Sequence, residues 1–373
     1  APDVAAARDL LAAVDLRGHG DSGWAEDADY EARLDRVRQV VGDIRFALGV
    51  QIVEAAQDPL EVGSALCRVA EAALLACAEA AGRDFRAAHG SIPGGELAVL
   101  GLGRLGGEML TPASDLDIVY IFSGDTAADS DGRRPLAATL YFNRLAQRLT
   151  AALSVPTAEG ALYEVDTRLR PQGNQGPLAV SIESFERYQK EDAWTWEHMA
   201  LCRARVLVAS PGVRNEIDRV IGEVLERERD PVQLKADILR MRGEMLAHKS
   251  PAGPLDAKLS RGALVDLEFV IHYLQLRHRT GFFPRLGEAI SALASKGLVA
   301  PDLADAHDRL TRILIASRLL APDGTMPPPP ADEVLARTCG YESPNQLLSA
   351  LQDARRIVAG EWKSAFGQEL ETE

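Results

Sequence analysis

Apolar residues recur at spacings of three and four through the first 90 residues, and this period predicts α-helices. The two longest candidates span residues 30–53 and 60–88. We expect a break between them at Asp58-Pro59, because the residue before a proline avoids the helical conformation. The N-terminal part of the chain is therefore predicted to be helical.

The pattern changes near Ile92, where short apolar runs are separated by glycine and proline. Three such runs predict strands, at residues 97–102, 117–122 and 162–169. A glycine-rich turn at 103–107 follows the first strand, and Pro171 closes the third. Amphipathic periods predict helices at 140–153 and 184–200. We therefore expect a small mixed sheet flanked by helices.

From about residue 214 the helical period continues almost to the end of the chain. We expect loops at 250–255 and at the proline run 327–330, which is predicted to link two helices. The predicted fold class is α+β and mostly helical. Its expected parts are an N-terminal helical segment, a domain with the sheet and a C-terminal helical bundle, at residues 1–55, 56–213 and 214–373.

Composition narrows the function classes. A formal net charge of −14 disfavours a nucleic-acid partner, since a sequence-independent grip on phosphates needs a surplus of Lys and Arg. Every apolar run is shorter than the ~20 residues of a membrane-spanning helix, so no membrane partner is expected. The four cysteines form no CxxC pair, which argues against zinc, and Cys67 and Cys77 fit the core. The start at Ala1-Pro2, without Met, indicates a fragment of a longer chain.

Two aspartates at the start of the second predicted strand are the first candidates for chemistry. Asp115 and Asp117 are separated by Leu116, so both carboxylates point to one face of the strand while the leucine points into the apolar layer. A third carboxylate, Asp166, lies on the third predicted strand. Three crowded carboxylates repel one another, and magnesium would remove that conflict because it prefers carboxylate and phosphate oxygens.

The glycine-rich turn supplies the other half of a candidate site. Its glycines would let the backbone approach a phosphate closely, and Arg104 offers a permanent positive charge. A helix opening at 108–110 would point its N-terminus at the phosphates. Taken alone, a glycine cluster is usually a turn and an Asp-x-Asp pair is usually a cap. The ordered set of strand, turn, Ser114-Asp115-x-Asp117, helix and third Asp is more specific.

This order resembles the nucleotidyltransferase fold of the DNA polymerase β superfamily. Longer motifs are similar to the glutamine synthetase adenylyltransferase/deadenylylase family, strongly over about residues 60–280. The matching segments are 102–108, 114–117, 163–171, 173–178, 188–190, 194–198 with Arg203 and Arg205, 256–258, Gly262 and 266–269. Two positions depart from the family pattern: Arg104 stands where Lys is more usual, and Ala263 follows Gly262 where a second glycine is common.

The resemblance implies an enzyme that moves AMP from ATP to a tyrosine of glutamine synthetase. It implies that Asp115, Asp117 and Asp166 hold two Mg²⁺ ions and that Asp166 helps to deprotonate the tyrosine. The implied nucleotide-binding residues are Gly103, Arg104, Gly106, Gly107, Ser114, Arg168 and Arg170. PII signalling proteins and glutamine are the implied regulators, in the cytoplasm.

The family joins an attaching and a removing half in one chain, and residues 192–198 resemble the attaching half. Three alternatives stay open: the removing half, in which phosphate releases ADP; a transferase acting on a small molecule or RNA; and a regulatory module without catalysis. The three intact aspartates argue against the last of these.

Several residues near the motifs have two interpretations. Arg168 and Arg170 are expected on the same strand face as Asp166, binding phosphate or neutralising carboxylates, or else paired with an acid such as Glu164. The remaining candidates form three pairs.

Trp194 and Trp196 would stack on adenine, contact the protein substrate or pack in the core, and we favour the core for Trp194. Glu197 and His198 would be catalytic or would be packing residues, and we favour packing for the histidine. Asp266 and Glu268 would line the cleft or an exposed face of a helix.

Overall fold

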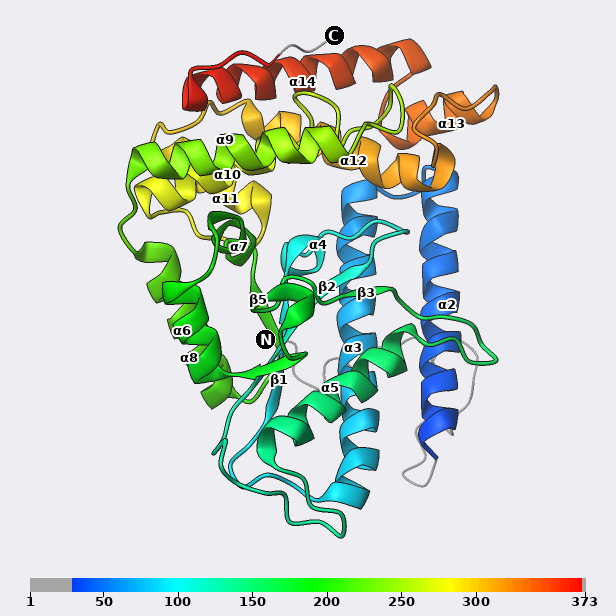
Figure 1. Ribbon diagram of the computed structural model, residues 1–373. Coiled ribbons are helices and arrows are strands. Elements are labelled where there is room, and N and C mark those ends of the chain that lie inside the picture. The colour runs from blue at the N-terminus through cyan, green and yellow to red at the C-terminus, as the bar shows by residue number, and fades with distance from the viewer. Residues whose placement is uncertain (1–28, 371–373) are drawn as a thin grey trace.

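Two long helices form one side of the molecule in the computed structural model, which describes residues 29–370 (Figure 1). Helix α2 spans Tyr30–Val53 and helix α3 spans Pro59–His89, and they pack side by side. The carboxylate of Asp58 accepts a hydrogen bond from the backbone N–H of Leu60, which caps α3 at the predicted break. Both helices were predicted within one residue, and the helical prediction for 1–28 lies outside the described residues.

The sheet is small and mixed. Its strands are β1 (Leu97–Gly101), β2 (Leu116–Phe122), β3 (Val165–Asp166), β4 (Ala179–Ser181) and β5 (Arg205–Val208). They run in the order β3-β2-β1-β5, with β4 also paired to β2. The pairs of β1 with β2 and β5 are antiparallel, whereas β3 and β4 run parallel to β2.

The third strand is shorter than predicted. Only Val165 and Asp166 of the expected strand 162–169 pair with β2, so the prediction is wrong for the rest of that range. The chain turns after Asp166, where the N–H of Arg170 donates to the carbonyl of Thr167. Leu162 and Tyr163 are nevertheless buried, which explains why their alternation resembled that of a strand.

The helix expected at 108–110 is also wrong. The short helix α4 instead occupies the glycine turn itself, at Gly103–Gly106, and Glu108 has a left-handed φ of 57° that ends the turn. Helix α5 (Ala138–Ser154) matches its prediction closely and packs on α3. The single helix expected over 184–200 is two, α6 (Ile182–Glu191) and α7 (Thr195–Leu201).

The C-terminal part is helical, as its period predicts. It contains α8 to α14, at Pro211–Glu226, Pro231–His248, Leu264–His278, Leu286–Ser295, Leu303–Leu320, Ala331–Thr338 and Pro344–Phe366. The prolines at 327–330 lie in the loop between α12 and α13. No helix within residues 29–370 has the length and apolarity to cross a membrane.

Alternation along β2 sends its side chains into two different cores. Leu116, Ile118 and Tyr120 pack with α2, α3 and α5, where Cys67 and Cys77 are buried as predicted. Val119 and Ile121 face the other way, into the core built with the C-terminal helices. Asp115 and Asp117 share the parity of Val119, so the carboxylates belong to the sheet face that the C-terminal helices cover. The domain boundaries after residues 55 and 213 stay predictions.

Candidate functional site

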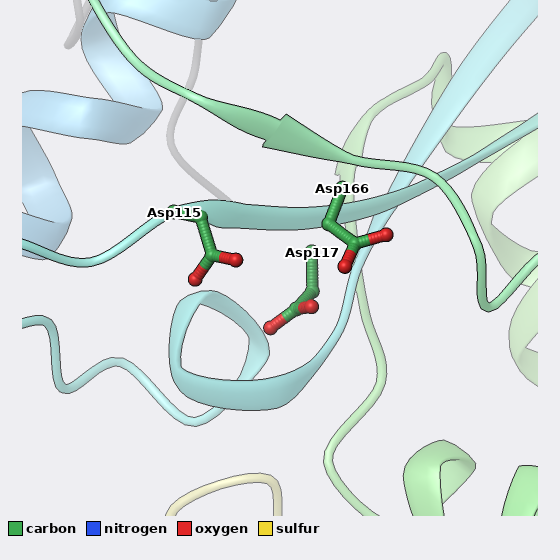
Figure 2. Close-up of side chains that lie close together, drawn as sticks. All are labelled: Asp115, Asp117 and Asp166. Atoms are coloured by element: carbon green, nitrogen blue, oxygen red, sulfur yellow. The ribbon is translucent and has the colours of Figure 1, made fainter.

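Three carboxylates meet at the N-terminal end of β2 (Figure 2). Asp117 is directly opposite Asp166 in the parallel pair of β2 and β3, and Asp115 immediately precedes β2. One carboxylate oxygen from each residue lies within 4.8 Å of the others. The clustering expected from the strand period is therefore present, and the catalytic and metal-binding roles of these residues stay predictions.

The charges in this cluster oppose one another. Burial, and then the neighbouring carboxylates of Asp115 and Asp166, raise the pKa of Asp117 to about 6. A hard dication relieves this repulsion, because oxygen ligands and negative charge are what Mg²⁺ prefers. The donor set therefore fits a magnesium site formed by the three aspartates.

Arg168 pairs with the third carboxylate. Its Nε donates to Asp166 Oδ2 at 2.8 Å, and its N–H groups hold the pKa of Asp166 below the usual range. The pairing matches the interpretation in which Arg168 neutralises a carboxylate. Arg170 does not share that face, contrary to the prediction, because β3 ends at Asp166. Its buried guanidinium donates to Thr167 O at 2.9 Å and braces the turn.

Gly103 is the point at which the glycine turn meets the carboxylates. Its φ is +54°, and a Cβ there would collide with the carboxylate of Asp117. Gly106 and Gly107 serve a different contact, because a Cβ on either would collide with Arg203. The three glycines therefore let α4 fit between β2 and Arg203. Their expected contact with phosphate stays a prediction.

Arg104 is a partly buried cation beside the glycine turn. Burial lowers its pKa to about 10, and Glu268 is the acid that most offsets this effect. The guanidinium stays protonated at neutral pH and also acts electrostatically on Asp117. The hydroxyl of Ser114 lies 2.9 Å from both the backbone nitrogen and the hydroxyl of Thr111. Nucleotide binding by both residues stays a prediction.

Three basic residues near the turn were not predicted as site residues. Arg203 pairs with Glu268, with 2.7 Å between Nη1 and Oε1. Arg205 pairs with Glu71 and donates from Nε to the carbonyl of Gly106 at 3.2 Å, which holds α4 in place. These two arginines belong to the resembling segment, but the sequence does not show what they contact.

Lys258 is the third basic residue that was missed. Burial, and then Arg104, lower its pKa, and its ammonium group in turn lowers the pKa of Asp117. It follows α9 in a loop that Asp256 stabilises by accepting the N–H of Lys258 at 2.8 Å. Nothing local to the segment indicates that this loop returns to β2, so no sequence signal besides the resemblance could have found it.

The remaining candidates divide between structure and surface. Trp194 is 64% exposed, so the prediction that it lies in the core is wrong. His198 is buried and lies 2.9 Å from the carbonyl of Gln189, as expected of a packing residue. Asp266 is fully buried and pairs with Arg242, so it belongs neither to an exposed face nor to the cleft.

Glu197 and Glu268 have different surroundings. Glu197 is buried and accepts the N–H of Trp194 at 2.9 Å, so it caps the start of α7. Glu268 lines a cavity together with Arg104 and Arg203, as expected of a residue behind the cleft.

Comparison with known proteins places this site in a family. The sequence profile described as glutamate-ammonia ligase adenylyltransferase matches residues 20–220, which include all five strands and the three aspartates. Similar proteins are each named bifunctional glutamine synthetase adenylyltransferase/adenylyl-removing enzyme. The protein of Rhizobium meliloti strain 1021 is 40% identical over 308 residues, 80% of this chain and 31% of that protein.

Two further relatives carry the same name. The protein of Mesorhizobium japonicum is 41% identical over 285 residues, covering 76% of this chain and 28% of its own length. The protein of Brucella suis biovar 1 is 37% identical over 349 residues, which cover 91% of this chain and 36% of that protein. The chain thus spans about a third of the length of these curated relatives. Because the family profile matches more than half of the chain, including the whole sheet, this chain belongs to the glutamate-ammonia ligase adenylyltransferase family.

Proposed function

We propose that this chain transfers AMP from ATP to a tyrosine hydroxyl of glutamine synthetase and releases pyrophosphate. The observation that carries the proposal is the cluster of Asp115, Asp117 and Asp166, with Arg104 and Lys258 acting electrostatically on it. Three carboxylates for a dication, beside two cations for a polyanion, suit a nucleoside triphosphate arriving with its metal. The family membership supports the same reaction class.

In this proposal Asp115, Asp117 and Asp166 would hold Mg²⁺, with two ions expected. When bound, magnesium would neutralise phosphate charge and favour the phenolate of the acceptor, since a free tyrosine has a pKa of about 10. Arg168 holds the pKa of Asp166 low, so this carboxylate is a weak proton acceptor. We therefore assign Asp166 to metal binding first.

The remaining side chains position the nucleotide. Arg104 would bind the triphosphate, beside a turn that Gly103, Gly106 and Gly107 keep narrow. Ser114 would shape the approach to Asp115 through its bonds to Thr111. Of the two arginines after β3, Arg168 would reach the phosphates by leaving Asp166, whereas Arg170 would support the turn. In-line attack by the acceptor oxygen on the α-phosphorus then depends mainly on positioning and charge.

We favour attachment over removal because residues 192–198 resemble the attaching half of the family. The relatives' names include both activities, so the opposite reaction, in which phosphate releases ADP from the modified synthetase, is the alternative. A module without catalysis would leave the three adjacent carboxylates without a physical role. A PII signalling protein and glutamine as regulators, and a cytoplasmic location, belong to the same proposal through the family resemblance.

Incubation with glutamine synthetase, Mg²⁺ and ATP labelled on the α-phosphate tests the proposal. Label on a tyrosine of the synthetase is the expected result, lost in Asp117→Asn and kept in Asp43→Asn. Asp43 is an exposed aspartate on α2 that serves as the matched control. ADP release from modified synthetase on addition of phosphate, without labelling, would show that the chain removes AMP. If the chain showed neither labelling nor ADP release, both reactions would be contradicted.

A further inference from the structure

A groove lies between the start of α7 and one face of α9, outside the carboxylate cluster. Its volume is about 670 Å³. Its floor is apolar, with Ile238 fully buried and Met241 partly buried. The lining residues at its rim are Asp192, Trp194, Trp196, Asp237, Arg240 and Glu244.

Two tryptophans stand at this groove with much of their surface in solvent. Trp194 is 64% exposed and Trp196 is 37% exposed. Exposed aromatic residues that are held in place mark binding surfaces, because they gain contact area on association at small entropic cost. Their backbone is fixed: the N–H of Trp194 donates to Glu197 at 2.9 Å, and the hydroxyl of Thr195 donates to Asp237 of α9 at 3.1 Å. The groove is therefore pre-formed.

The charges around the tryptophans select the occupant. Asp237 is already satisfied, since Thr195, Gln233 and Arg240 all donate to it. Asp192 and Glu244 are exposed and make no ion pair or side-chain hydrogen bond within residues 29–370. Carboxylates beside tryptophan rings favour a cation, because the ring face and the carboxylate both attract guanidinium and ammonium groups.

Both walls of the groove lead to the three aspartates. Helix α9 lines the groove from Gln233 to Glu244, and Lys249 just beyond its end acts electrostatically on Asp166. By the rise of an α-helix, Glu244 lies only about 8 Å along the axis from Lys249. The other wall, α7, is followed by Arg203, against which Gly106 and Gly107 pack. An extended segment that leaves the groove along α9 would therefore lead toward the carboxylates.

We propose that this groove binds the acceptor protein through a segment in which an Arg or Lys side chain lies beside an apolar residue, close in sequence to the tyrosine that is modified. The proposal rests on the proposed function, because it identifies the occupant as the protein substrate of that reaction. The apolar residue would cover Ile238 and Met241, and the cation would lie between a tryptophan ring and Glu244 or Asp192.

Direct binding measurements test the docking surface separately from turnover. Glutamine synthetase and Mg²⁺-ATP would each be titrated into the full chain by calorimetry, for the wild type and three variants. The first variant replaces both tryptophans, Trp194→Ala with Trp196→Ala. The second keeps their shape and removes the charges, Asp192→Asn with Glu244→Gln. The control is Phe46→Ala, an aromatic residue on α2 that is 75% exposed and lies outside the groove.

The tryptophan variant should weaken the Kd for glutamine synthetase by at least about tenfold, as truncation of aromatic anchors does. The charge variant should weaken it about three- to tenfold and flatten its dependence on salt. The control and every Kd for ATP should change less than about twofold. An unchanged Kd for the synthetase, no binding by the wild type, or weakened ATP binding in the tryptophan variant would each overturn the proposal. Binding without turnover by the wild type would instead contradict the proposed function alone.

Discussion

The guanidinium of Arg168 binds the Asp166 carboxylate at the position where a metal ion would bind it. Both oxygens of that carboxylate accept its Nε–H, at 3.0 and 2.8 Å, while 72% of the arginine side chain is exposed. A metal ion at Asp166 must therefore compete with an arginine that is free to swing into solvent. The same side chain could then meet the phosphates of the nucleotide.

Replacing Arg168 should separate these two roles. Arg168→Ala should lower the Kd for Mg²⁺ about two- to fivefold, because the competing N–H donors are lost, and should raise the Kd for Mg²⁺-ATP if the guanidinium also binds phosphate. Mn²⁺ binding followed by electron paramagnetic resonance and calorimetry with ATP measure the two constants. Arg356→Ala, which removes an exposed arginine paired with Asp353, is the control and should change neither. Weaker metal binding in Arg168→Ala would contradict the competition.

Gly103 offers a second test at the scale of one residue. Gly103→Ala should destabilise the fold by about 1–2 kcal/mol through its left-handed φ and, in addition, displace the carboxylate of Asp117. The control is Gly94→Ala, whose φ of +64° gives a similar strain with nothing within 4 Å of the new Cβ. Urea unfolding should show a loss in both variants, whereas weakened Mg²⁺ binding should appear only in Gly103→Ala. Equal Mg²⁺ affinities in the two variants would show that the turn does not position Asp117.

At the scale of the elements, a buried ion pair joins α9 to α10. Arg242 Nε lies 2.5 Å from Asp266 Oδ1, and the second carboxylate oxygen accepts the N–H of Gly262 at 2.7 Å. The side chains are 4% and 0% exposed, so neither charge can be rehydrated if its partner is lost. This pair fixes the helix that lines the groove relative to the helix that bears Glu268.

Breaking this pair should be costly. Arg242→Met should lower the free energy of unfolding by about 3–5 kcal/mol, because Asp266 is left buried without its cation. Arg240→Met, two residues earlier on the same helix, should cost less than about 1 kcal/mol, since Arg240 is 58% exposed. Urea denaturation curves for both variants test the contrast. Equal losses would show that α9 and α10 do not depend on the buried pair.

The helices and strands also show which parts of the fold the sequence patterns could predict. The period of 3.6 located α2 and α3 closely, because each buries a continuous apolar stripe. Period-two spacing predicted that Asp115 and Asp117 share a face, and the ligand atoms do lie together. Strands β4 and β5 were not predicted, since they have only 3 and 4 residues and depend on pairing with β2 and β1.

Tertiary contacts explain the remaining differences. Trp194 looked like a core residue because aromatic residues usually are, yet its side chain is largely exposed at the start of α7. Lys258 acts electrostatically on Asp117 from a loop that lies 141 residues later in the chain (258 − 117 = 141). Neither local period nor composition encodes such an approach. The site could therefore be predicted only as far as its three carboxylates and its glycine turn.

At the scale of the whole molecule, β2 lies between two cores and the site lies at their junction. One core holds α2, α3 and α5, and the other holds the C-terminal helices. Ion pairs also cross from one side to the other. Arg312 of α12 forms one, since its Nη2 lies 2.9 Å from Oδ2 of Asp58 at the start of α3. This ion pair couples the first half of the chain to the last helices.

The pH dependence of stability should reveal this coupling. Burial raises the pKa of Asp58, but the hydrogen bonds from Arg312 and from the N–H of Leu60 outweigh it and lower the pKa below its ordinary 3.8. A carboxyl whose folded pKa is depressed stabilises the fold above its unfolded pKa, and that contribution is lost as the pH falls through the folded value. Asp58→Asn keeps a residue that caps helices well and removes only the charge. The variant should be less stable than the wild type at pH 6.

This difference should shrink as the pH falls below about 4, where Asp58 of the unfolded wild type begins to take up a proton, and should be lost once the folded carboxyl is protonated as well. Urea unfolding of both proteins between pH 6 and pH 3 measures it. Arg312→Gln should show the same convergence, because the pair is lost from its other side. A gap that stays constant down to pH 3 would mean that Asp58 acts only as a cap. In that case the charge of Asp58 would not couple the two cores, and the site at their junction would not respond to acid through this pair.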